Sequence, residues 1–123
     1  MKFQPTRRHV LASLAAAPIA WHGALRAQDA PLRVGQSTAL SGPLGDLGQA
    51  MHQGARACFA AVNAKGGVNG RTIDLQTRDD GYDVPRALAN AQAFLADKDC
   101  FALFNCMGTP AIDAMLPKVL EIP

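Results

Sequence analysis

The feature that most constrains the fold is an alternation of strand-like and helix-like segments along the chain. Residues 32–38 form a short run without helical spacing that ends at a cluster of turn-forming residues. A helix-like stripe follows and ends near the Gly66-Gly67 pair. Its apolar positions are Leu47, Met51, Ala55, Cys58, Phe59 and Val62. The folded part of the chain is therefore expected to begin with a strand and an amphipathic helix.

A second strand and helix follow in the same order. Residues 73–78 alternate Ile73, Leu75 and Thr77 with polar side chains, which is the period of a strand that has one wetter face. This strand is expected near an edge of the sheet. Asp83 is placed to cap the next helix, and Pro85 suits its first turn.

The third unit begins with the apolar run from Cys100 to Cys106. Such a run is typical of a strand that is buried on both faces of a parallel sheet. Thr109 is placed to cap a third helix, with Pro110 at its first position. The apolar stripe of that helix consists of Ile112, Met115, Leu116 and Val119.

This order predicts an α/β fold with a parallel, Rossmann-like sheet between two layers of helices, that is, three α-β-α layers. Three strands are few for an independent domain, so the fold is expected to be incomplete. Ligands of such sheets bind beyond the carboxyl ends of the strands. In the common strand order 2-1-3, the glycine-rich turns after the first and third strands would meet there. The sequence therefore predicts a binding crevice between these two turns.

The first 27 residues have the layout of a signal peptide, with basic residues around an apolar run and no acidic residue. The basic residues are Lys2, Arg7, Arg8 and Arg26. The apolar run of about 12 residues is shorter than the roughly 20 that span a bilayer as a helix. Arg7-Arg8 favours twin-arginine export over ordinary Sec export, which stays the alternative. We therefore expect residues 1–27 to be removed and residues 28–123 to form the exported part.

The charge of the exported part gives no support for nucleic-acid binding. The chain has 12 Lys and Arg and 10 Asp and Glu, and removal of the four basic residues of the signal leaves 8 against 10. The exported part is therefore slightly acidic and has few aromatic residues, whereas nucleic-acid-binding proteins are typically basic.

The cysteine, histidine and aspartate residues do not form a recognisable metal or redox site. Cys58, Cys100 and Cys106 allow at most one intrachain disulfide, and their spacing does not match a zinc site. Cys58 and Cys100 are expected to be small buried residues of a helix and a strand. His52 is expected on a solvated helix face. Asp79, Asp80 and Asp83 are interpreted as residues of a strand end and a helix cap, so no metal site is expected.

A nucleotide-dependent enzyme is the main rival interpretation, because a glycine-rich turn follows the first strand. The glycines Gly42, Gly45 and Gly48 have the spacing G-x-x-G-x-x-G, which differs from the G-x-G-x-x-G of dinucleotide sites. No combination of Ser, His and Asp residues, or of Cys and His residues, is expected to form a catalytic site either. We therefore expect a protein that is not an enzyme and needs no cofactor.

Four segments of the chain are informative together: LSGPLGDLGQ, NAKGGVNGR, DDGYDVPRALANA and the Gly-Thr-Pro turn within FNCMGTP. They resemble the type I periplasmic solute-binding proteins of ABC transport systems, specifically the branched-chain amino-acid or leucine/isoleucine/valine-binding group. The resemblance extends over nearly all of residues 32–123. It implies two α/β lobes that close on a small polar solute, of which residues 28–123 form the N-terminal part of lobe one. Such a piece is expected to have marginal stability and no measurable affinity by itself.

The resemblance also implies which residues contact the ligand. It places the Ser41-Gly42 turn, Leu47 and the turn formed by residues 107–109 beside the bound solute. The candidate ligand-binding residues are Ser41, Gly42, Leu47, Met107, Gly108 and Thr109. Leu47 stands where members often carry an aromatic ring, and Met107 where some amino-acid binders carry serine. These departures leave carboxylates and amides open beside amino acids. An ordinary cap or turn role stays the alternative for Ser41, Thr109 and the glycines.

The resemblance further implies a periplasmic location, a small-molecule ligand and an ABC permease as partner. A module of the same fold that reports a solute to a receptor kinase is the alternative, as is an inactive truncated fragment. Cys106 matches a position that holds half of a disulfide in some relatives, but the expected partner near Gly81 is absent.

Overall fold

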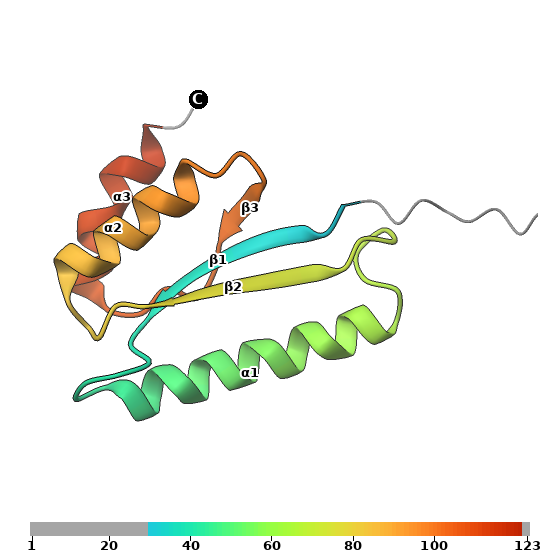
Figure 1. Ribbon diagram of the computed structural model, residues 1–123, viewed down its shortest axis with the longest axis horizontal. Coiled ribbons are helices and arrows are strands. Elements are labelled where there is room, and N and C mark those ends of the chain that lie inside the picture. The colour runs from blue at the N-terminus through green and yellow to red at the C-terminus, as the bar shows by residue number, and fades with distance from the viewer. Residues whose placement is uncertain (1–29, 122–123) are drawn as a thin grey trace, which may run out of the picture.

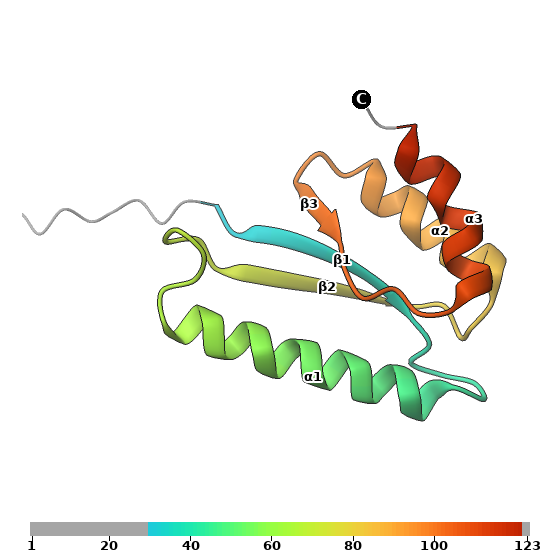
Figure 2. The ribbon, with the colours of Figure 1, turned by 180° about the vertical axis from the view of Figure 1, so that it is seen from behind.

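The computed structural model describes residues 30–121. Three strand-helix units follow one another (Figure 1): β1 (Leu32–Thr38), α1 (Gly45–Ala64), β2 (Ile73–Asp79), α2 (Val84–Leu95), β3 (Cys100–Leu103) and α3 (Thr109–Leu120). The strands form one parallel sheet in the order β2-β1-β3. Helix α1 lies on one side of this sheet, and α2 and α3 lie together on the other (Figure 2). The predicted α/β fold with three layers is confirmed, and the strands have the common 2-1-3 order that the expected crevice requires. The expected signal peptide, residues 1–27, lies outside the described residues.

The central strand β1 is the most buried element. It pairs with β2 in unbroken register from Leu32↔Ile73 to Thr38↔Asp79, and every residue from 34 to 39 is buried. Gly35 allows the ring of Phe94 in α2 to lie directly on the strand, because a Cβ at this position would be 2.7 Å from a ring carbon. Residues of α2 and α3 complete a small core of Ala87, Ala91, Ala111 and Met115.

The predicted third strand is shorter and more exposed than expected. It ends at Leu103 rather than at Cys106, and Phe101 is 71% exposed. The prediction of a strand buried on both faces is therefore wrong, because β3 pairs only with β1 and lies at an edge of the three-stranded sheet. Asn105 interrupts the strand with a φ of 51°, in the left-handed region. Beyond it the chain returns to β1, where the N–H of Met107 donates to the carbonyl of Ser37 at 3.1 Å.

Helix α1 contacts the sheet through fewer side chains than its apolar stripe predicts. Its buried residues are Gly45, Gly48 and Ala55, whereas Leu47 and Cys58 are exposed. At Gly48 the helix approaches the preceding turn so closely that a Cβ would lie 1.8 Å from the carbonyl oxygen of Ala39. The first turn of α1 is therefore held by a glycine contact.

Helix α3 also buries less than predicted. Met115 is buried, but Ile112 is 38% exposed and Leu116 is 49% exposed. These two predictions are wrong because α3 packs mainly on α2, and β3 is the edge strand beside it. We call the exposed apolar residues of β3 and α3 the apolar flank. Its members are Phe101, Ile112, Leu116 and Leu120.

The predicted helix starts are confirmed in one case and wrong in another. The side chain of Asp83 accepts a hydrogen bond from the N–H of Arg86 at 2.9 Å and caps α2 as expected. Thr109 does not cap α3, because Gly108 occupies the capping position and Thr109 is the first helical residue. Within residues 30–121, no helix combines the length and the apolar character needed to cross a bilayer.

Candidate functional site

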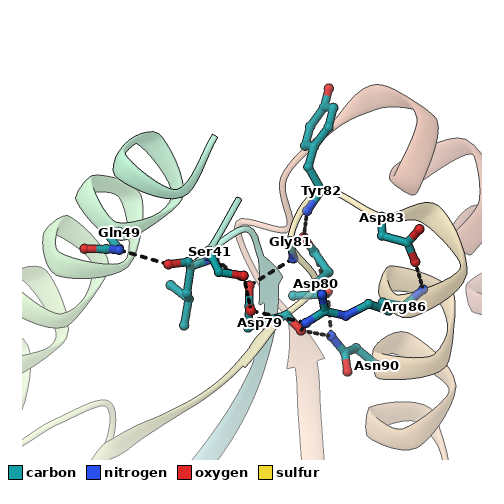
Figure 3. Close-up of polar contacts among 11 residues, drawn as sticks. Ser41, Gln49, Asp79, Asp80, Gly81, Tyr82, Asp83, Arg86 and Asn90 are labelled. Atoms are coloured by element: carbon teal, nitrogen blue, oxygen red, sulfur yellow. Dashed lines mark hydrogen bonds and ion pairs between the residues drawn. The ribbon is translucent and has the colours of Figure 1, made fainter. Parts of the chain in front are cut away.

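Three turns meet at the carboxyl ends of the strands. The turn after β1 and the turn after β3 are joined where the hydroxyl of Thr38 lies 3.6 Å from the sulfur of Met107. The turn after β2 lies beside the first, because a Cβ on Gly42 would be 3.3 Å from the carbonyl oxygen of Gly81. The six predicted ligand-binding residues lie in the turns after β1 and β3 or in the first turns of the helices that follow, and these turns share one rim of the sheet. Figure 3 shows the polar side chains of this rim.

Asp79, at the end of β2, holds the turn after β1 in place. One carboxylate oxygen accepts hydrogen bonds from the N–H groups of Leu40 at 2.8 Å, Ser41 at 3.2 Å and Gly81 at 2.9 Å. The other accepts the hydroxyl of Ser41 at 2.6 Å and the guanidinium of Arg86 at 3.2 Å (Figure 3). One carboxylate thus connects the first two strand ends to helix α2.

These donors explain the charge state of Asp79. The hydrogen bond from the Ser41 hydroxyl is the largest of several that lower the pKa of Asp79, with further contributions from the N–H groups of Gly81 and Leu40 and from Arg86. Burial opposes them. Asp79 is therefore ionised at neutral pH, and it engages the hydroxyl proton of Ser41.

Asp80, the next residue, is fully buried and connects the end of β1 to the turn after β2. Its carboxylate accepts the hydroxyl of Ser37 at 2.7 Å and the N–H of Tyr82 at 2.8 Å. The side-chain amide of Asn90 in α2 donates to the same Ser37 hydroxyl at 3.2 Å. We call this set of connected side chains the polar rim. Its members are Ser37, Ser41, Asp79, Asp80, Arg86 and Asn90.

The polar rim satisfies its own hydrogen bonds. Across residues 30–121, no buried side-chain nitrogen or oxygen lacks a hydrogen-bond partner. In the same part of the chain, no group of three or more His, Cys, Asp and Glu residues is arranged to hold a metal ion. Asp79 and Asp80 therefore act as acceptors for N–H and O–H groups of the chain itself.

The start of α3 supplies donors at the same rim. The first intrahelical bond runs from the N–H of Ile112 to the carbonyl of Gly108 at 2.9 Å. The N–H groups of Thr109 and Ala111 precede that bond, and such groups have no acceptor within their own helix. The side chain of Thr109 is exposed, whereas that of Met107 is buried and its N–H is occupied by Ser37. Donors for an anion are thus concentrated at Thr109 and the residues after it.

The remaining predicted contact, Leu47, lies in the first turn of α1 and is 54% exposed. The neighbouring Gln49 donates to the carbonyl of Leu40 at 2.9 Å and closes the turn after β1 (Figure 3). Leu47 therefore lies in the first turn of the helix that follows Ser41 and Gly42, with its apolar side chain exposed.

Other residues depart from their expected positions. His52 is half-buried, with Nδ1 at 3.0 Å from the hydroxyl of Thr77 and 3.3 Å from the side-chain oxygen of Gln36, so its prediction as a solvated residue is wrong. Cys58 is exposed rather than buried, and Cys100 and Cys106 are partly buried. All three thiols are free, and burial raises the pKa of the Cys106 thiol.

Cys106 also lines an apolar groove of about 300 Å³ between the end of β3 and α3. The groove is lined with Leu103, Phe104, Ile112 and Met115 among others, and none of the six predicted ligand-binding residues contributes to it.

Sequence reasoning missed the connecting roles of Asp79, Asp80 and Tyr82. The available signal was the Asp-Asp pair at the end of a predicted strand, since that position faces the rim where ligands of parallel sheets bind. Tyr82 gave no periodic signal, because it lies in a turn. Its φ of 63° is in the left-handed region, which a tyrosine seldom adopts.

Comparisons with known proteins agree with the fold. The family model described as periplasmic binding protein matches residues 31–122. The Leu/Ile/Val-binding protein homolog 2 of Brucella abortus (strain 2308) is 35% identical over 68 residues, which are 55% of this chain and 18% of that protein.

Solved structures give the same result. A crystal structure described as a possible leucine/isoleucine/valine-binding protein, from Rhodopirellula baltica SH 1, has a TM-score of 0.72 and 32% identity over 80% of this chain and 27% of its own. A fatty acid ABC transporter substrate-binding protein from Thermomonospora curvata has a TM-score of 0.69 and 30% identity over 74% of this chain and 23% of its own.

The chain spans between 18% and 27% of the length of these three relatives. Within that span, the family match extends over nearly the whole part that the structure describes. The order of strands, the turns at a common rim and this match lead to one conclusion: the chain belongs to the periplasmic binding protein family.

Proposed function

We propose that residues 28–123 form the N-terminal part of lobe one of a substrate-binding protein that serves an ABC import system. The protein is not an enzyme in this proposal: it binds a small solute in the periplasm and delivers it to a permease. The relatives support this role, because two are described as Leu/Ile/Val-binding and one as a substrate-binding protein of a fatty acid ABC transporter. Since the chain spans about a quarter of the solved relatives, the proposed cleft also requires a second lobe.

The proposed ligand is a small carboxylate with an apolar part, such as an amino acid, or a corresponding amide. Leucine, isoleucine and valine carry an amino group that fatty acids lack. All of these compounds share a carboxylate and an apolar chain. The observation that carries this proposal is the convergence of the turns after β1 and β3 at one rim, where α3 begins. A helix N-terminus stabilises an anion by about 0.3 to 2 kcal/mol, depending on burial.

Different tasks are proposed for these contacts, and the hydrogen bonds of the rim support them. Thr109, with its exposed hydroxyl and the N–H groups of the first turn of α3, is the proposed partner of the carboxylate. The hydroxyl of Ser41 already donates to Asp79, so it faces a ligand as an acceptor and suits an amino or amide N–H. Leu47 offers apolar contact, and Gly42 and Gly108 allow the close approach of Gly81 and of the Tyr82 ring at the rim.

A thermal-shift screen tests the proposal. The complete gene product, with the second lobe, is heated with amino acids, short carboxylates and their amides. A ligand that binds the folded state at 100 times its Kd stabilises it by about 2.7 kcal/mol. We expect stabilisation by at least one carboxylate, and failure of every compound to raise the Tm would overturn the proposal.

A matched pair of variants locates the site. Thr109→Val removes a hydroxyl at the start of α3, and Thr72→Val makes the same change before β2, at the opposite end of the sheet. We expect Thr109→Val to weaken binding of the stabilising carboxylate about tenfold, as for a charge-assisted hydrogen bond, and Thr72→Val to leave the Kd unchanged. Equal affinities of both variants would place the ligand elsewhere.

A further inference from the structure

Tyr82 occupies an unusual position between the turns that carry the proposed ligand contacts. It follows Gly81, and both residues have a positive φ, 58° for Gly81 and 63° for Tyr82. Glycine adopts such a conformation freely, but tyrosine does so at a cost in backbone strain. Strained residues of this kind are concentrated at functional sites.

Two carboxylates hold this strained pair. The N–H of Gly81 donates to Asp79 at 2.9 Å, and the N–H of Tyr82 donates to the fully buried Asp80 at 2.8 Å. Asp80 is in turn fixed by the hydroxyl of Ser37. The backbone of Tyr82 is thus anchored to the polar rim, while its side chain extends away from the sheet (Figure 3).

The ring of Tyr82 lies against the turn that precedes α3. A Cβ built on Gly108 would lie 2.7 Å from one ring carbon and 3.4 Å from two others. Only a residue without a side chain fits between the ring and the turn, and Gly108 also has a φ of 99°. The ring is therefore positioned beside the first N–H groups of α3, and 43% of Tyr82 stays exposed.

We propose that Tyr82 is a further specificity-determining residue of the binding site, whose ring packs against a flat, unsaturated group next to the carboxylate of the ligand. This inference rests on the proposed function. It adds a preference for aromatic carboxylates over saturated carboxylates of the same size. An aromatic pair in offset or edge-to-face contact contributes beyond its buried area, and a saturated ring lacks that contribution.

The test compares two probes that differ only in ring saturation, sodium benzoate and sodium cyclohexanecarboxylate. Their Kd values are measured by calorimetry on the complete gene product. We expect benzoate to bind about three- to tenfold more tightly, as the contribution of an aromatic pair implies. Tyr82→Phe keeps the ring and should keep this preference. Tyr82→Leu should reduce the ratio of the two Kd values to about one.

Phe101→Leu is the matched control, because it makes the same kind of change at a 71% exposed aromatic residue of β3 outside the rim. Phe101→Leu should leave the ratio of the two Kd values as it is in the unsubstituted protein. A wild-type ratio near one, or an unchanged ratio in Tyr82→Leu, overturns the inference while binding itself still supports the proposed function. Absence of binding of any carboxylate overturns both.

A measurement without substitution covers the case in which Tyr82→Leu does not fold. Tyr82 is the one tyrosine of these 123 residues, so isotope labelling of this segment alone within the complete gene product makes its ring protons recognisable by NMR. We expect a nuclear Overhauser effect between these protons and bound benzoate. Bound benzoate without that effect contradicts the inference.

Discussion

The polar rim and the apolar flank lie on the same small sheet but are stabilised in opposite ways. The polar rim connects residues of β1, β2 and α2 through hydrogen bonds that leave no buried side-chain group without a partner across residues 30–121. The apolar flank, on β3 and α3, leaves Phe101 71% exposed and Leu120 74% exposed. The proposed site is thus fixed by local polar contacts, whereas the flank adds little to the stability of the described residues.

The largest expected effect is in the polar rim. Asp80→Ala removes a fully buried carboxylate and leaves the hydroxyl of Ser37 and the N–H of Tyr82 without their acceptor. Loss of the acceptor of a fully buried hydroxyl and of a part-buried N–H should lower the free energy of unfolding by about 4 kcal/mol, measured by urea denaturation. Asp113→Ala, at an exposed position of α3, is the control and should change it by less than about 0.5 kcal/mol. Similar values for both variants would mean that the rim is not a stabilising network.

The second largest change in stability is expected at a glycine contact beside the rim. Gly48→Ala places a Cβ 1.8 Å from the carbonyl oxygen of Ala39, so α1 or the turn must move. We expect a loss of about 3 kcal/mol in the free energy of unfolding. Gly54→Ala lies in the same helix, where a Cβ has no neighbour within 4 Å, and it should stabilise the protein by about 1 kcal/mol. The two variants are expected to change the free energy of unfolding in opposite directions. A change in the same direction would refute the close contact.

The pH dependence tests Asp79. Its pKa is lowered in the folded state, mainly by the Ser41 hydroxyl, so its contribution to stability is complete above its unfolded pKa of about 4 and is lost as the pH falls below that value. Asp79→Asn should cost about 1 kcal/mol at pH 7 and should flatten the acid side of the stability curve. Urea denaturation between pH 7 and pH 2.5 measures both. A variant with the same acid slope as the wild type would contradict this assignment.

The smallest effect is expected in the apolar flank. Leu120→Gln replaces a side chain that is 74% exposed, and it should change the free energy of unfolding by less than about 0.5 kcal/mol. Denaturation in urea checks this value. A loss of 2 kcal/mol or more, about that of a buried leucine, would show that the flank is covered in solution and would remove the contrast with the rim.

The sequence predicted the architecture well because periodicity and turn residues are local signals. The bounds of β1 and the cap at Asp83 follow from patterns within about ten residues, and both are confirmed. The 2-1-3 strand order was assumed because it is common in such sheets, and it is the order observed. Burial along α1 and α3 was predicted less well. Leu47, Ile112 and Leu116 have helical spacing, yet their exposure depends on which elements cover each helix.

The sequence predicted which turns form the candidate site, but it did not predict the hydrogen bonds within the site. The rim shared by the turns after β1 and β3 follows from a parallel sheet. The bond between Ser41 and Asp79 joins residues 38 positions apart and depends on the turn conformation, for which the sequence has no periodic signal. The left-handed conformation of Tyr82 and Asn105 escaped prediction for the same reason. The ligand contacts of the six candidate residues stay a prediction.

The central place of β1 has a consequence for the order in which the protein folds during its synthesis. Arg33 pairs with Asp74 on one side and with Cys100 on the other, so its two partners leave the ribosome one after the other. Once β2 has emerged, β1 can complete its first edge, and its second edge stays unpaired until β3 follows. An unpaired strand edge is a template for contact with other chains. During the interval between the two pairings, the second edge of β1 is therefore open to pairing with other chains.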